Sequence, residues 1–222
     1  MQFKIDFMKK MLVFTLFIFC LTAFRPNNTV FEKGWNNLFD GKSLNGWKVG
    51  ENASTFSVDS GMIIVHGKTA HLFYDGKVHN HQFKNFEFKA DVKTMPGANS
   101  GIYFHTQYQQ ASWPEKGYEV QINNSHTDWR RTGSLYGIMD VKEQYIKDYE
   151  WYTEYIKVEG KRVVIKLNDR VVVDYTEPDN VKSVREPDDS LRILSSGTFA
   201  LQGHDPKSIV YFKNIMVKAL KD

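Results

Sequence analysis

The sequence is almost free of cysteine: Cys20 is the only one in 222 residues. It lies within an apolar N-terminal stretch, so a chain cleaved after this residue has none. That excludes a disulfide framework, a thiol nucleophile and a cysteine metal site in the mature chain. Stability must therefore come from a packed core, and the remaining length of about 200 residues suffices for one sizeable domain.

Net charge is also small. The chain carries +3 at pH 7, and its first 24 residues hold three Lys and one Asp, which leaves the remainder near +1. A nearly neutral surface gives no electrostatic case for a nucleic-acid partner, and we expect a monomer.

The sequence shows no sustained helical periodicity, so helices are expected to be few and short. The catalytic motifs Gly-x-Ser-x-Gly and Glu-x-x-His are also absent.

The N-terminus has the layout of a secretory signal. Lys4, Lys9 and Lys10 precede Met11–Phe24, an apolar stretch of fourteen residues without a charge. This stretch is too short for a typical membrane span. The alternatives are an uncleaved anchor and lipid attachment at Cys20, although a bulky residue precedes that cysteine. We expect signal 1–24, domain 30–222, and an exported chain that is periplasmic or outer-membrane associated, without further membrane contact.

From Val30 onward the chain consists of short β-type runs separated by turn signals. The expected strands are 55–59, 62–66, 83–94, 99–107, 118–123, 152–158, 162–167, 171–175, 197–204 and 209–220. Their even spacing predicts a single all-β sandwich or barrel. Thr176–Leu191 is expected to be a long surface loop. Loops 107–117 and 125–135 are expected to overhang a cleft.

Polar side chains alternate along two of these strands. Period two places Glu119, Gln121 and Asn123 on one face of the strand 118–123. It likewise places Tyr103 and His105 on one face of the preceding strand. Such a face is commonly just solvated, and a lone strand histidine is usually structural. The alternative that we favour is a binding site in which the histidine moves protons.

A third strand, 198–204, puts Gln202 and His204 on a common face. If the three strands are neighbours, their polar faces form one floor. Amide, imidazole and carboxylate groups suit a ligand rich in hydroxyls, because each hydroxyl both donates and accepts a hydrogen bond. Trp113, Trp129 and Trp151 offer apolar faces to a sugar ring, or else belong to the core.

Four histidines within sixteen residues raise the question of a metal: His66, His71, His79 and His81. His79 and His81 would share a face of a strand. A third ligand at a diagnostic spacing is missing, so we expect no metal site here. A divalent metal elsewhere stays open, and no other cofactor is expected.

The opening Trp35–Trp47 (WNNLFDGKSLNGW) resembles the start of the 3-keto-disaccharide hydrolase domain, a secreted family abundant in Bacteroidetes. Further segments follow in the family's order over about residues 34–220. They are Asn99–Ile102, Gly117–Ile122, Thr132–Gly137, Trp151 with Tyr155, Asn168 with Val171–Tyr175, and Ala200–His204 with Phe212–Ile215. One departure is Asp205, which stands where a glycine usually follows the histidine.

The resemblance implies a concanavalin-A-like jelly roll of two curved antiparallel sheets, with the ligand on the concave one. It also implies activity on 3-keto-glycosides, which a separate glycoside 3-oxidoreductase produces. A ketone at C3 acidifies the C2 proton, so a base can form an enolate that expels the glycosidic oxygen at C1. The resulting 2-hydroxy-3-keto-glycal can add water, which gives net hydrolysis.

This chemistry assigns hypothetical roles. Glu119 or His204 is the base at C2, and His105 and Tyr136 are candidates for the acid or the enolate donor. The substrate-binding candidates are Gln121, Asn123, Gln202, Tyr103, Trp113 and Trp129.

The sequence bears on two other classes of function. Glucanases of the same fold place carboxylates as Glu-x-Asp-x-Glu, whereas Glu119-Val120-Gln121-Ile122-Asn123 has only the first. Double displacement on an unoxidised glucan is therefore not expected from this strand. A non-catalytic carbohydrate-binding module or lectin remains the alternative, because the fold supports either.

Overall fold

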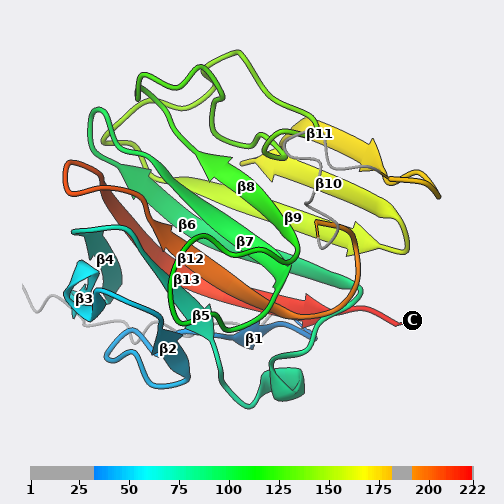
Figure 1. The fold of residues 1–222 in the computed structure, drawn as a ribbon, viewed down its shortest axis with the longest axis horizontal. Helices are drawn as coiled ribbons and strands as arrows, with labels where there is room; N and C mark the ends of the chain where they lie inside the picture. Colours follow the sequence, from blue (N-terminus) through cyan, green and yellow to red (C-terminus); the bar gives the residue numbers. More distant parts are fainter. Residues whose placement is uncertain (1–32, 182–191, 222) are drawn as a thin grey trace, which may run out of the picture. The chain divides into compact units, whose positions relative to one another are not determined.

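The computed structural model describes residues 33–181 and 192–221 (Figure 1). The signal predicted over residues 1–24 lies outside the described residues, as does most of the predicted loop, 182–191. The compact unit containing the strands is Glu32–Asp222. Among the described residues, no helix is long and apolar enough to cross a membrane.

Two antiparallel sheets make up this unit (Figure 1). Within the described residues the larger sheet has eight strands, in the order β11-β10-β9-β6-β13-β4-β3 with β1 also paired to β13. These strands are β1 (Asn36–Asn37), β3 (Phe56–Asp59), β4 (Met62–His66), β6 (Phe86–Thr94), β9 (Tyr152–Glu159), β10 (Arg162–Leu167), β11 (Arg170–Thr176) and β13 (Ile209–Ala219). The prediction of an all-β jelly-roll sandwich is confirmed.

The smaller sheet has five strands in the described part of the chain, ordered β2-β5-β12-β7-β8. They are β2 (Trp47–Val49), β5 (Ala70–Tyr74), β7 (Ser100–Thr106), β8 (Tyr118–Ile122) and β12 (Thr198–Gly203). Thus the three strands predicted to share a polar face are indeed neighbours, with β7 between β12 and β8.

The core lies between the sheets. On β6 the residues of one face, Phe86, Phe88, Ala90 and Val92, are fully buried, as the alternation predicts. Phe199 of β12 packs on them from the smaller sheet, with ring centroids 4.9 Å from Phe86 and 4.7 Å from Phe88. Burial of such large apolar side chains supplies the stability that disulfides do not.

The opening motif is structural. The indole N–H of Trp47 donates to the carbonyl of Leu38 at 2.8 Å. One carboxylate oxygen of Asp40 accepts from the backbone N–H of Lys42 at 2.7 Å and of Ser43 at 2.8 Å, which closes the turn. The motif therefore anchors the first strands, and none of its residues lines the pocket described below.

One local prediction is wrong. His79 and His81 do not share a strand face, because they lie in the short 3-10 helix η2 (Val78–His81). Both have φ of 48°, a left-handed conformation that interrupts any regular strand. The second 3-10 helix of the described chain is η1 (Ala53–Thr55).

Candidate active site

The outer face of the five-stranded sheet carries the candidate site. Every residue of β8 is buried, on both faces of the strand. The polar residues of β8 are therefore not a solvated face. Glu119 is 4% exposed and Gln121 is 1% exposed, and polar groups buried to this degree require hydrogen-bond partners.

The carboxylate of Glu119 has partners from β7 and from β12, the next two strands of the sheet. One oxygen accepts from the Tyr103 hydroxyl at 2.8 Å, and the other accepts from the Gln202 amide N–H at 2.8 Å. Burial and the charge of Glu119 raise the pKa of Tyr103 well above its usual value, so the phenol remains a donor. These bonds tie β7, β8 and β12 together at one point.

A glycine makes room for that carboxylate. A Cβ added at Gly101 on β7 would lie 2.6 Å from an oxygen of Glu119 and 2.9 Å from its Cγ. Any side chain here must displace the glutamate. The Asn-Ser-Gly-Ile segment noted in the sequence therefore positions Glu119.

A small pocket of about 60 Å³ opens beside this cluster. It is lined by Asn99, Trp113, Glu119, Gln121, Asp128, Tyr136, Gln202 and His204. Six of these were predicted as site residues. Glu119 and His204, the two candidate bases, therefore face a common hollow.

His204 follows directly after β12 and is held by its neighbour. Its Nδ1 lies 2.8 Å from an oxygen of Asp205. The same oxygen accepts from the Ser208 hydroxyl at 2.8 Å, and the other accepts from the Lys207 N–H at 2.8 Å. Partial burial acts to raise the pKa of Asp205, but these hydrogen bonds outweigh it and hold the pKa at about 2. Asp205 is therefore an ionised acceptor that fixes the imidazole through Nδ1.

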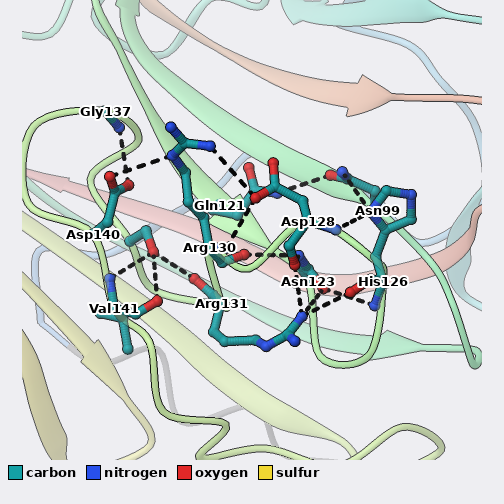
Figure 2. Close-up of polar contacts among 11 residues, drawn as sticks. Asn99, Gln121, Asn123, His126, Asp128, Arg130, Arg131, Gly137, Asp140 and Val141 are labelled. Atoms are coloured by element: carbon teal, nitrogen blue, oxygen red, sulfur yellow. Dashed lines mark hydrogen bonds and ion pairs between the residues drawn. The ribbon is translucent and has the colours of Figure 1, made fainter. Parts of the chain in front are cut away.

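A second polar cluster supports the pocket from the loop after β8 (Figure 2). The Gln121 amide donates to Asn99 at 2.9 Å, and the Asn99 amide lies 3.4 Å from Nδ1 of His126. That nitrogen also accepts the backbone N–H of Asp128 at 3.1 Å. The guanidinium of Arg130 reaches back to Asp128 at 3.5 Å. The loop that brings Asp128 to the pocket is thus braced by side chains.

His105 does not join the site, contrary to the prediction. Its φ of 56° is left-handed, and the pairing of β7 with β12 shifts register nearby. The ring is turned toward the core, with Phe86 5.6 Å away. Its Nε2 donates to the carbonyl of Lys84 at 2.8 Å and its Nδ1 accepts the N–H of Ser195 at 3.1 Å. Burial lowers the pKa of His105 to about 4, and the neutral ring is a structural brace.

Asn123, predicted to bind substrate, is not among the residues that line the pocket. It lies just past the end of β8 and is fully buried. Its amide donates to the carbonyls of Asp128 at 2.9 Å and Arg130 at 2.7 Å, while its oxygen accepts from His126 and Arg131 (Figure 2). These four hydrogen bonds of the Asn123 side chain hold the loop in place.

The three tryptophans considered as sugar contacts lie at different places in the structure. Trp113 lines the pocket, and its ring centroid lies 5.5 Å from that of His204. Trp129 is outside the pocket. It is 47% exposed, with Arg130 4.8 Å and Lys142 5.7 Å from the ring. Trp151 lies against two lysines of the eight-stranded sheet. Of these three tryptophans, Trp113 is the one that lines the pocket.

Three residues at or beside the site were missed. Asp128 lines the pocket from a loop, where periodicity gives no signal, whereas Asn99 begins the predicted strand 99–107 on the same face as Tyr103, so the alternation could have indicated it. His71 was not predicted as a site residue, although the alternation of β5 places it on the polar face, paired with Gln202. No group of three or more His, Cys, Asp or Glu within the described chain could hold a metal ion.

Fold and pocket together define an all-β sandwich domain with a small, polar, hydrogen-bonded pocket on the outer face of one sheet. The chain belongs to the family of the 3-keto-alpha-glucoside-1,2-lyase-like domain, which matches residues 34–218. A curated relative, the 3-keto-disaccharide hydrolase of Bacteroides thetaiotaomicron, is 30% identical over 171 residues. The match covers 64% of this chain and 58% of the relative, so this chain spans less than two thirds of it.

Solved structures share the fold. A candidate glycosyl hydrolase of Parabacteroides distasonis superposes with a TM-score of 0.70 at 23% identity, over 85% of this chain and 94% of that one. The carbohydrate-binding module CBM66 of Bacillus subtilis superposes with a TM-score of 0.56 at 16% identity, over 78% and 96%. At these identities the likeness concerns the fold alone.

Proposed function

We propose that this domain is a carbohydrate-active enzyme that cleaves 3-keto-glycosides by elimination across C1 and C2, followed by hydration. Family membership and the name of the curated relative support this class of substrate. The observation that carries the proposal is His204, fixed by Asp205 and facing the same pocket as Glu119 and Tyr136.

The steps balance without an added oxidant or reductant. The base takes the C2 proton, and the C2–H electron pair moves to the C3 carbonyl oxygen as an enolate. The enolate re-forms the ketone while the bond from C1 to the glycosidic oxygen breaks. The departing oxygen takes a proton and leaves as the aglycone alcohol. Water then adds to the 2-hydroxy-3-keto-glycal, its oxygen to C1 and a proton to C2.

We assign the base to His204. Its Nδ1 is engaged by Asp205, which leaves Nε2 as the nitrogen that can accept the C2 proton. The adjacent aspartate then stabilises the imidazolium that forms. Tyr136, which also lines the pocket, is assigned as proton donor to the enolate or leaving oxygen.

Glu119 has a different assignment. It already accepts hydrogen bonds from Tyr103 and Gln202, and it is almost fully buried. We assign it to holding the sugar, together with Gln121 and Gln202, while Trp113 covers the ring. Glu119 is also the alternative candidate for the base. The His204→Ala variant below distinguishes this alternative from His204.

The experiment uses a chromogenic 3-keto-glucoside and the matching unoxidised glucoside. We expect release of the aglycone from the keto substrate alone. His204→Ala should lower kcat by about 10² to 10⁴, the usual contribution of a general base. Asp205→Asn should lower kcat about tenfold, because it leaves the imidazole without its ionised partner. The matched control is His66→Ala, an exposed histidine on β4.

Two outcomes would contradict the proposal. Equal turnover by wild type and His204→Ala would remove His204 as base and return the assignment to Glu119. Saturable binding of unoxidised oligosaccharide, with no turnover of any keto-glycoside, would instead identify a non-catalytic binding module.

The proposal also covers the source of the substrate and the cellular location of the protein. A 3-keto-glycoside forms only when a C3 hydroxyl is oxidised, so a glycoside 3-oxidoreductase must act first. We propose that the chain is exported and acts on sugars outside the cytoplasm, with no partner needed for the pocket to form. Detection of the mature chain in a periplasmic or membrane fraction would test the location.

A further inference from the structure

His71 is a buried histidine that the reaction above does not use. It lies on β5, directly across from Gln202 of β12 in the antiparallel pairing. The alternation of β5 puts Ala70 and Leu72 in the core, while His71 and Phe73 lie on the face shared with Tyr103. His71 is therefore on the site face of the sheet, and only 3% of it is exposed.

Two neighbouring polar atoms lack partners there. Among the residues that the structure describes, neither Nε2 of His71 nor the amide oxygen of Gln202 has a hydrogen-bond partner. Side chains directly across an antiparallel pair have Cβ atoms about 5 Å apart. Buried polar atoms without partners are rare, and a pair of them beside a pocket indicates a group that binds between them.

The surroundings determine what His71 can offer. The rings of Tyr103 and Trp113 each lie 5.4 Å from the imidazole, and both residues belong to the candidate site. Burial, and then the nearby charge of His204, lower the pKa of His71 to about 4. A neutral imidazole has one N–H donor and one acceptor nitrogen, and the Gln202 oxygen is an acceptor.

We propose that His71 and Gln202 together bind one hydroxyl group of the sugar. The imidazole N–H donates to the hydroxyl oxygen, and the hydroxyl donates to the amide oxygen of Gln202. A hydroxyl is the group that satisfies one donor and one acceptor at once. This inference rests on the proposed function, because it places a sugar in the same pocket, and it makes His71 a specificity-determining residue.

The geometry agrees with the other contacts of Gln202. Its amide N–H groups are already directed to Glu119 at 2.8 Å and Tyr103 at 3.2 Å, which fixes the orientation of the amide. The amide oxygen of Gln202 therefore points away from Glu119 and Tyr103 and can accept another hydrogen bond. Gln202 thus holds Glu119 with one end and a substrate hydroxyl with the other.

The test compares wild type, His71→Leu and His71→Gln on a 3-keto-glucoside and its 2-deoxy, 4-deoxy and 6-deoxy analogues. His71→Leu should raise KM for the parent substrate about tenfold to a hundredfold, with a smaller change in kcat. One deoxy analogue should show the same KM in wild type and variant, because it lacks the hydroxyl concerned. His71→Gln keeps an amide N–H near the position of Nε2 and should restore most of the affinity. His66→Leu, at an exposed position of β4, is the matched control.

Stability provides a second readout. An apolar side chain removes the unpartnered polar atom, so His71→Leu should melt at the wild-type temperature or above. Unchanged KM values for all four substrates, or an equal loss for all four, would overturn the inference while leaving the proposed function intact. Failure of both variants to fold would show a structural role and overturn it too. Absence of turnover in wild type would remove the proposed function and this inference together.

Discussion

Glu119 and Glu154 are both buried carboxyl groups on strands, one on each sheet, and their surroundings differ. Glu119 is held by two donors and lines a pocket. Glu154, on β9, faces the core and is fully buried. The Tyr152 hydroxyl donates to it at 3.3 Å, and its other oxygen has no partner among the described residues.

The difference shows that burial alone does not make a carboxyl group functional. Burial raises the pKa of Glu154 well above its usual value, because one hydrogen bond does not offset the loss of solvent. Glu154 therefore prefers to stay protonated. Glu119 has partners that match an acceptor-only carboxylate, and it also has access to a ligand.

The largest expected effect separates the two groups directly. Glu119→Gln should lower kcat/KM about 10²-fold, because an amide cannot accept from both Tyr103 and Gln202 and the sugar loses its position. Glu154→Gln, the matched control, should retain wild-type activity. Steady-state kinetics on the 3-keto-glucoside measure both. Similar losses in the two variants would mean that the comparison reflects stability and not the site.

A smaller effect is expected from the glycine beneath Glu119. Gly101→Ala should displace the carboxylate and reduce kcat/KM about tenfold to a hundredfold. The free energy of unfolding should fall by only about 1 to 2 kcal/mol, since the clash is with the end of a side chain.

A double variant sharpens this prediction. If Gly101→Ala acts through Glu119, its combination with Glu119→Gln should lose no more activity than Glu119→Gln alone. Additive losses would show that the alanine disturbs the pocket by another route.

Alternation along strands predicted the regular part of the site. It placed Glu119, Gln121 and Gln202 on one face, and the structure brings them to one pocket. Period two is a property of an extended backbone, so it holds wherever the strand stays extended. It did not reach His71, because no strand was predicted over Ala70–Tyr74, where the structure has β5.

The other incorrect or missing predictions concern residues at which the backbone is not part of a regular extended strand. The left-handed φ of His105 turns its side chain to the core, and no sequence pattern predicts this backbone conformation. Asn123 follows the end of β8, where loop carbonyls take its amide. Asp128 reaches the pocket from the loop after β8, which is placed by tertiary contacts such as the bond from the Asn123 amide to the Asp128 carbonyl. Hydrogen bonds of this kind depend on the complete fold and not on local sequence.

The smallest effect concerns Glu154 and the dependence of stability on pH. A folded-state pKa above the unfolded value means that the folded chain binds the proton more tightly. Its contribution to stability is complete below about pH 4.5 and is lost as pH rises through the folded pKa. Each unit of difference in pKa amounts to about 1.4 kcal/mol.

Glu154→Gln removes this titration and should flatten the curve. We expect the variant to match wild type near pH 4 and to exceed it increasingly toward pH 8, measured by urea unfolding across this range. Glu159→Gln, an exposed carboxylate at the end of the same strand, should leave the slope unchanged. A wild-type curve parallel to that of Glu154→Gln would mean that Glu154 is ionised in the core. The contrast with Glu119 would then have to rest on pocket access alone, since charge state would no longer separate the two carboxyl groups.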